Sequence, residues 1–210
     1  MLSQNDLAKT LFPLGQLTKP EVRKLAHSFG VRAAEKKESQ EICFVPQDDY
    51  CSYLSGALPG LAEKVANGDI VDETGKVIGK HRGYPFYTIG QRRGLGIAAK
   101  EPLYVTALDT EHNRIHVGKK SSLECRQLIA SGLNLIGLES LTGTIEACGK
   151  IRYRDRETLC TLEPLDDNSA TVSFASPKNA VSAGQAAVFY RDNEVLGGGF
   201  ITRIINTPQL

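Results

Sequence analysis

Short apolar runs separated by turn residues dominate the chain after Pro59-Gly60, and this pattern constrains its fold more than any other feature. Two pairs of runs joined by turn sequences predict β-hairpins, one over residues 68–78 and one over residues 103–117. Further runs follow from Leu128 to Ile205, with strands expected near Gly143–Tyr153, Thr158–Glu163, Ala170–Phe174, Ala186–Tyr190 and Val195–Thr202. Short strands at this spacing predict a closed barrel.

The first segment has a helical pattern instead. Thr18 and Glu21 have capping-box spacing, Pro20 lies in the first turn, and apolar residues recur at helical intervals before the stop at Gly30. A short helix is also expected over Gln47–Leu54. The predicted fold class is therefore α+β and mainly β, with a short helical N-terminal segment, a small β-rich central domain and a C-terminal antiparallel β-barrel.

Composition limits the classes of function. The net charge of +1 over 210 residues gives no global signal for a polyanionic partner, so a nucleic-acid site must come from local clustering. The five cysteines form no C-x-x-C pair, which argues against a disulfide framework and a zinc site and fits a reducing compartment. No run reaches the length of a membrane span, and the N-terminus lacks the blocks of a secretory signal. We expect a cytoplasmic protein with no metal site and no membrane partner.

Cys43 is the first candidate for chemistry. It follows the cations Lys36 and Lys37, and nearby positive charge lowers the pKa of an accessible thiol toward the reactive thiolate. The alternative is a small core residue between Ile42 and Phe44, because free cysteine is among the most buried residue types. A third interpretation pairs Cys43 as a nucleophile with His81.

A basic cluster suggests a phosphate-binding surface. Four cations alternate over the end of a predicted strand, so that their side chains should share one face, namely Lys150, Arg152, Arg154 and Arg156. Tyr153 would then point the other way or lie at the strand edge. The alternative is a solvated face balanced by nearby acids, namely Asp155, Glu157 and Glu163.

Two glycine-rich segments are also informative. The segment Tyr87–Gly96 carries Gly90, Gly94 and Gly96 beside Arg92 and Arg93, which predicts a sharply turning loop that can hold a phosphate or expose its arginines to solvent. Gly197-Gly198-Gly199 predicts a bulge or a tight barrel corner.

Four motifs in one order resemble the tRNA-specific 2-thiouridylase family. They are Lys36-Lys37-Glu38-Ser39-x-x-Ile42-Cys43-Phe44, Tyr87-Thr88-Ile89-Gly90-Gln91-Arg92-Arg93-Gly94-Leu95-Gly96, Arg152-Tyr153-Arg154 and Gly184-Gln185-x-Ala187-Val188-Phe189-Tyr190. The resemblance runs from about Leu2 to Ile205. It implies an enzyme that activates C2 of the wobble uridine of certain tRNAs with ATP and replaces its oxygen by sulfur from a cysteine persulfide.

The resemblance also implies roles for single residues. Cys43 corresponds to the cysteine that receives the persulfide, while Arg152, Tyr153 and Gln185 correspond to contacts with the anticodon arm. Electrostatics alone adds further candidate tRNA contacts, namely Lys150, Arg154, Arg92 and Arg93. The implied partners are tRNA and a persulfide donor such as a cysteine desulfurase or a relay protein.

The resemblance predicts the organisation of the chain. Residues 1–46 would be the tail of the family's ATP-binding domain, 47–125 its central domain, and 126–210 its C-terminal β-barrel. The family's Ser-Gly-Gly-x-Asp-Ser phosphate loop does not occur in this sequence. We therefore expect a fragment that holds no cofactor itself, needs ATP with Mg only in the full-length enzyme, is inactive alone, and exposes apolar surface over residues 1–46.

Overall fold

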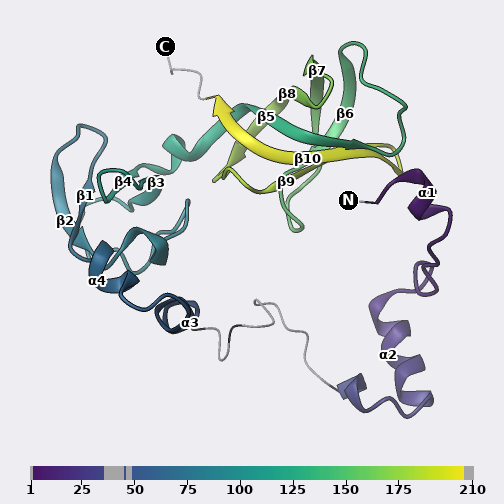
Figure 1. Cartoon of the computed structure of the whole chain (residues 1–210), viewed down its shortest axis with the longest axis horizontal. Helices are drawn as coiled ribbons and strands as arrows, with labels where there is room; N and C mark the ends of the chain where they lie inside the picture. The colour runs from purple at the N-terminus through teal and green to yellow at the C-terminus, as the bar shows by residue number, and fades with distance from the viewer. Residues whose placement is uncertain (1, 36–44, 46–48, 206–210) are drawn as a thin grey trace. The chain divides into compact units, whose positions relative to one another are not determined.

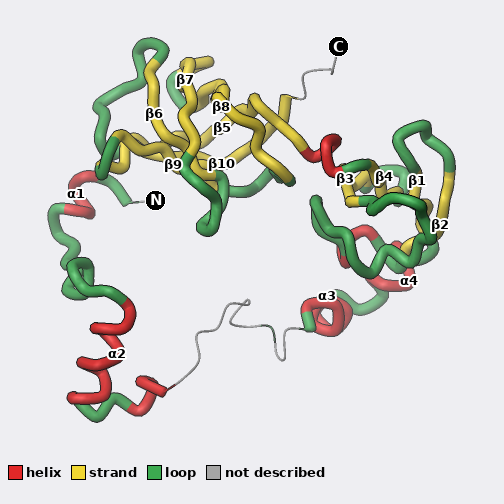
Figure 2. Tube along the Cα trace, turned by 180° about the vertical axis from the view of Figure 1, so that it is seen from behind, coloured by secondary structure: helices red, strands yellow, loops and turns green. Residues whose placement is uncertain are grey.

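The structure is a computed structural model that describes residues 2–35, 45 and 49–205 (Figure 1). The chain forms two compact units, Leu2–Leu58 and Pro59–Leu210. The first consists of helices and loops and the second is mainly β (Figure 2). The predicted fold class is confirmed. The domain boundaries at 46/47 and 125/126 stay predictions.

The first unit contains short helices, namely α1 (Gln4–Leu7), α2 (Lys19–Ser28), the 3₁₀ turn η1 (Arg32–Glu35) and α3 (Tyr50–Ala57). The predicted capping box is confirmed, because the Glu21 carboxylate accepts hydrogen bonds from the Thr18 N–H and hydroxyl, both at 2.7 Å. Gly30 ends the helix with φ +64°. The helix predicted over Gln47–Leu54 is α3, which begins at Tyr50 because Asp49 caps it by accepting the Ser52 N–H at 3.0 Å, and which ends at Ala57. The predicted start at Gln47 lies outside the described residues.

Apolar side chains of the first unit are widely exposed, as expected. Leu11, Phe12 and Phe29 are 89%, 63% and 78% exposed, and α2 has no buried residue. None of the helices in the described ranges has the length and apolar character needed to cross a membrane.

The second unit begins with α4 (Leu61–Val65) and a four-stranded sheet of order β2-β1-β4-β3. Its strands are β1 (Gly68–Val71), β2 (Val77–His81), β3 (Tyr104–Asp109) and β4 (Arg114–Gly118). Both predicted hairpins are present as antiparallel pairs, β1 with β2 and β3 with β4, and β1 joins them by pairing in parallel with β4. The short 3₁₀ turn η3 (Tyr84–Phe86) comes before the loop that leads to β3. A second one, η4 (Lys120–Leu123), comes between β4 and the barrel.

His81 is a structural residue of this sheet. It is 3% exposed, its Nδ1 accepts the Gly83 N–H at 3.0 Å, and its Nε2 lies 3.1 Å from the Asn113 carbonyl. A neutral imidazole protonated on Nε2 satisfies both contacts. Burial lowers the pKa of His81, against weaker raising effects from the Asn113 carbonyl and Asp69. With both ring nitrogens engaged, His81 is poorly placed to act as a base for Cys43, which itself lies outside the described residues.

The remaining strands close into an antiparallel barrel of order β10-β5-β8-β7-β6-β9. Their bounds are β5 (Glu124–Leu135), β6 (Ile145–Lys150), β7 (Thr158–Asp166), β8 (Ser169–Asn179), β9 (Ala186–Arg191) and β10 (Glu194–Ile205). Alternate side chains fill the interior, including Leu128, Val172, Phe189 and Ile201, each no more than 1% exposed.

The three consecutive glycines lie where β10 bends between its neighbours. The pairing register shifts between Val195 and Gly197 against β9, and between Gly198 and Phe200 against β5, which confirms the predicted bulge. A Cβ on Gly198 would lie 2.6 Å from the Ala187 carbonyl oxygen, and one on Gly199 would lie 2.9 Å from the Ser131 carbonyl oxygen. Close approach of the two neighbouring backbones therefore requires glycine here.

Gly198→Ala is expected to destabilise the barrel, because the new methyl would clash with a strand backbone that cannot move without breaking the β9–β10 ladder. Overpacking of this kind costs about 1–3 kcal/mol of the free energy of unfolding. Gly143→Ala is the matched control, because nothing lies within 4 Å of its Cβ position. Urea unfolding followed by circular dichroism measures both, and equal midpoints for the two variants would contradict the close approach.

The free energy of unfolding is expected to fall as the pH drops below about 6.5, the ordinary pKa of histidine. The folded state holds His81 neutral with a lowered pKa, so the unfolded state binds its proton first, and this stability is lost as the pH falls toward the folded pKa. Unfolding of wild type and His81→Gln is compared from pH 7.5 to 5.5, and His81→Gln should flatten the wild-type slope. Equal slopes for the two proteins would contradict the neutral buried histidine.

Candidate nucleic-acid interface on the barrel

The β6–β7 connection, residues 151–157, departs from the predicted strand. β6 ends at Lys150 and Ile151 is buried in the barrel core at 1% exposure. The chain then turns, with the Asp155 N–H donating to the Arg152 carbonyl at 3.1 Å. The predicted one-sided stripe of four cations is therefore wrong, because Arg152, Arg154 and Arg156 lie on a loop where side chains do not alternate between two faces.

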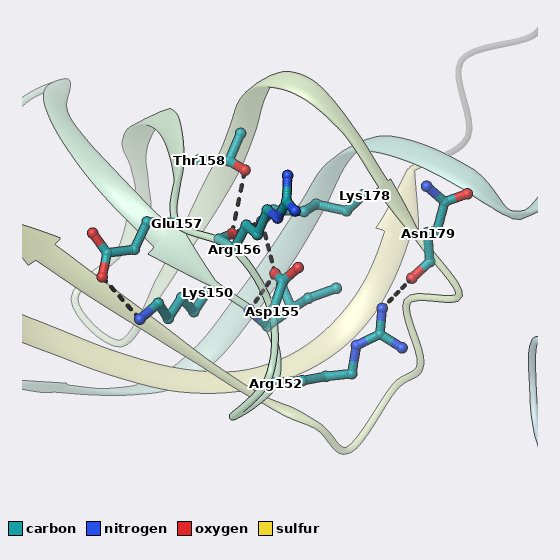
Figure 3. Close-up of polar contacts among 9 residues, drawn as sticks. Lys150, Arg152, Asp155, Arg156, Glu157, Thr158, Lys178 and Asn179 are labelled. Carbon is teal, nitrogen blue, oxygen red and sulfur yellow. Dashed lines mark hydrogen bonds and ion pairs between the residues drawn. The ribbon is translucent and has the colours of Figure 1, made fainter.

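A buried lysine of β8 holds this loop through two hydrogen bonds (Figure 3). Lys178 on β8 is 4% exposed, and its Nζ donates to Asp155 Oδ2 and to the Arg156 carbonyl, both at 2.7 Å. The same carboxylate oxygen accepts the Ile151 N–H at 3.2 Å. The Lys178 ammonium also lies 5.1 Å from the centre of the Phe174 ring.

Lys150 and Arg152 are each held by a neighbouring group. Lys150 forms an ion pair with Glu157 at 2.8 Å and lies 5.4 Å from the centre of the Tyr190 ring. The hydrogen bond to Glu157 raises the pKa of Lys150, which keeps it charged. Arg152 is exposed and donates from Nη2 to the Asn179 carbonyl at 2.7 Å, which uses one of the five guanidinium donors.

A surface groove of about 510 Å³ joins this loop to β9 and the residue before it. Its lining consists of Lys150, Ile151, Arg152, Tyr153, Gln185, Ala186, Val188 and Tyr190. The structure thus brings together four predicted site residues from two segments of the chain. Tyr153 is 97% exposed, so its ring is offered to solvent at the groove. That these residues bind tRNA stays a prediction.

Gln185 contributes an unsatisfied polar atom to the groove. Its Oε1 is buried and has no hydrogen-bond partner within the described part of the chain. Buried amide oxygens are nearly always paired in native proteins, so such an atom calls for a donor from elsewhere. The groove thus combines cations, an exposed aromatic ring and the side chain of Gln185 within one concave surface.

Four groove residues were not singled out from the sequence as site residues, namely Ile151, Ala186, Val188 and Tyr190. Val188 and Tyr190 lie within the fourth motif, and the alternation of β9, in which residues 187 and 189 are buried, is the signal that places them on the outer face. Their pairing with β6, Val188 opposite Lys150 and Tyr190 opposite Cys148, became evident only from the barrel topology.

Arg92 and Arg93 lie in the loop before β3 and are not among the residues that line the barrel groove. Gly90, Gly94 and Gly96 all have positive φ, from +67° to +86°, which confirms the sharply turning backbone. Arg92 lines a separate pocket of about 430 Å³ together with residues of the same loop. Gln91 holds the loop by donating to the Arg93 carbonyl at 2.9 Å. Whether these arginines contact tRNA stays a prediction.

The cysteines differ in their chemical environment. Cys43 lies outside the described residues, so its predicted role stays a prediction. Cys125 and Cys160 are buried, and burial raises the pKa of both thiols, for Cys160 to about 12. Within the described ranges, no three side chains of the kind that bind metals come together.

Known protein families match this chain in three consecutive segments. Three family domains match, described as tRNA methyl transferase HUP domain over residues 1–47, tRNA methyl transferase PRC-barrel domain over 61–119 and aminomethyltransferase beta-barrel domain over 125–201. Curated relatives named tRNA-specific 2-thiouridylase MnmA are 70% identical in Chlorobium phaeobacteroides, 66% in Chlorobaculum tepidum and 46% in Heliobacterium modesticaldum.

These matches cover 97%, 97% and 96% of this chain, but only 57%, 56% and 52% of the relatives. The chain thus spans a little over half the length of the proteins it matches. The domain descriptions name a methyl transferase, whereas the relatives are named as 2-thiouridylases, and identity of up to 70% over nearly the whole chain links it to the relatives. Over the part of these proteins that it spans, the chain belongs to the tRNA-specific 2-thiouridylase family.

Proposed function

We propose that this chain is the tRNA-binding and sulfur-carrying portion of a tRNA 2-thiouridylase, an enzyme that replaces O2 of the wobble uridine by sulfur. The observation that carries the proposal is the barrel groove, which combines Lys150, Arg152, Tyr153 and Gln185 in a chain 70% identical to such an enzyme. The first proposed partner is tRNA, bound through its anticodon arm.

The chemistry of the groove suits an RNA loop. Cations such as Arg152 and Lys150 contact phosphates and supply affinity without reading sequence. Recognition of RNA in loops relies on unstacked bases that stack on aromatic rings and form hydrogen bonds through their edges. The exposed ring of Tyr153 offers a surface for stacking, and the side chain of Gln185, which lines the groove, is proposed to supply the contact to a base edge. Arg154, Arg92 and Arg93 are proposed as further phosphate contacts.

Cys43 is proposed to carry the sulfur. Its thiolate attacks the terminal sulfur of a persulfide on a donor protein, the donor's sulfur–sulfur bond breaks, and the donor leaves as a thiolate while Cys43 becomes the persulfide. The lysines that precede Cys43 favour the thiolate. A cysteine desulfurase or a relay protein is the proposed donor.

ATP enters the proposal only through the full-length enzyme. The phosphate-binding motif that the family uses, Ser-Gly-Gly-x-Asp-Ser, does not occur in this sequence. No residue described here is therefore assigned to ATP or Mg, and the chain by itself is proposed not to adenylate uridine.

Arg152→Ala with Arg154→Ala is expected to weaken tRNA binding and to flatten its dependence on salt. Each lost phosphate contact should reduce the slope of log K against log salt by about one. Arg126→Ala with Arg203→Ala is the matched control. Both control residues are exposed arginines of the barrel outside the groove, and Arg126, like Arg152, donates to a β8 carbonyl at 2.7 Å.

Fluorescence anisotropy with unmodified tRNA at several salt concentrations measures the affinities. Equal slopes for wild type and the Arg152/Arg154 double variant would mean that this surface is merely solvated. A change of the same size in the control pair would mean that binding depends on general positive charge and not on the groove.

Cys43 is expected to gain one sulfur atom when the chain is incubated with a cysteine desulfurase and cysteine. Mass spectrometry of peptides after alkylation locates the added sulfur. Cys43→Ser should abolish the gain, and Cys51→Ser, which removes a half-buried cysteine of the same unit, should leave it unchanged. A Cys43 that resists alkylation in the folded chain and gains no sulfur would instead indicate a non-catalytic RNA-binding barrel with a structural cysteine.

A further inference from the structure

Lys178 is a buried cation in the wall of a barrel whose core is mainly apolar. At 4% exposure its ammonium has lost nearly all contact with water, and a buried charge is tolerated only with close partners. Apart from the Phe174 ring on its own strand, those partners come from the β6–β7 loop, as the Asp155 carboxylate 23 residues earlier and the Arg156 carbonyl 22 residues earlier in the chain.

Asp155 extends this contact to the other end of the loop. The Asp155 oxygen that accepts the hydrogen bond from Lys178 Nζ also accepts the Ile151 N–H at 3.2 Å, and the Asp155 N–H donates to the Arg152 carbonyl. The segment Arg152-Tyr153-Arg154 therefore lies between Ile151 and Asp155, which are joined by the hydrogen bond from the Ile151 N–H to the Asp155 carboxylate. Lys178 in turn binds that carboxylate. Figure 3 shows the carboxylate between the lysine and the loop.

The next residue of β8 holds the loop at a second point. The Asn179 carbonyl accepts a hydrogen bond from Arg152 Nη2 at 2.7 Å. Two adjacent residues of β8, Lys178 and Asn179, therefore both bind the loop. A methionine would occupy a volume similar to that of Lys178 and suit the apolar core. It would offer no donor to Asp155 or to the Arg156 carbonyl.

We propose that Lys178 is a positioning residue for tRNA binding, which together with Asp155 holds the loop in the shape that presents Arg152, Tyr153 and Arg154 to the RNA. The inference rests on the proposed function and deepens it, because it attributes the fixed conformation of the binding loop to a residue that does not touch the tRNA. A loop held in its binding shape loses less conformational freedom on binding and therefore binds more tightly.

The test compares wild type with Lys178→Met/Asp155→Asn in the full chain. The double variant leaves no unpaired buried charge, keeps an acceptor for the Ile151 N–H and preserves the net charge, so it avoids the large penalty of breaking a buried pair from one side. Lys80→Met/Asp69→Asn is the matched control. It makes the same substitutions in a more exposed ion pair, 2.6 Å long, in the central sheet.

The first measurement uses no RNA. Trypsin cleaves after arginine, and the loop offers Arg152, Arg154 and Arg156. Under conditions where circular dichroism shows all variants folded, the Lys178/Asp155 variant should be cut in the loop at least several times faster than wild type and the control. Cleavage at the wild-type rate would overturn the proposal.

The second measurement is tRNA affinity with a mutant cycle. Unlocking the loop should weaken binding by about tenfold, the order expected from immobilising a few flexible side chains. Arg152→Ala should cost less affinity in the unlocked background than in wild type, because the two changes act on one binding element. A purely structural Lys178 would leave the effect of Arg152→Ala the same in both backgrounds, and that result would overturn the positioning role.

The two measurements separate the two proposals. If wild type binds no tRNA while trypsin still distinguishes the variants, the proposed function fails and the loop lock stands. If the double variant does not fold, hydrogen exchange on wild type decides, because the Ile151 amide is then expected to be protected by Asp155. Exchange of that amide at the rate of an open loop would overturn the lock.

Discussion

The pairing of β9 with β6 is the contact on which both the barrel and the groove depend. β9 is a short strand between β6 and β10, and its register with β6 sets Val188 opposite Lys150 and Tyr190 opposite Cys148. This pairing closes the sheet, so neither β6 nor β9 is left as an open edge. It also brings Gln185 and the outer face of β9 beside the loop that follows β6. The closure of the barrel and the shape of the groove therefore depend on the same backbone hydrogen bonds between β6 and β9.

The charges of the β6–β7 loop are sorted by sign. Its acids, Asp155 and Glu157, pair with lysines of the barrel strands, Lys178 and Lys150. Its arginines are exposed. The alternative of a balanced face is partly correct, because the acids do neutralise cations, but these cations are the two lysines of the strands and not the arginines of the loop. Whether the arginines bind phosphates stays a prediction. The loop presents arginine to solvent while its carboxylates are occupied.

Local patterns predicted the parts of this fold that depend on local physics. The Thr18/Glu21 cap, the two hairpin turns and the alternation of the barrel strands each need only neighbouring residues, and all are present. The end of β6 at Lys150 could not be predicted in this way. Residues 150–156 alternate in charge as a strand would, and the turn depends on a lysine far along the chain. The closeness of Gln185 to Arg152 likewise required the barrel topology, although the resemblance had named both residues.

The buried thiols of the barrel have a consequence for chemical selectivity. A thiol with a pKa of about 12, as at Cys160, is ionised in only about one molecule in 100,000 near neutral pH, and burial shifts Cys125 in the same direction. Sulfur moves between proteins by attack of a thiolate, so a protonated and enclosed thiol is a poor acceptor. We therefore expect these two thiols to react more slowly with alkylating reagents and persulfides than an exposed cysteine with an ordinary pKa.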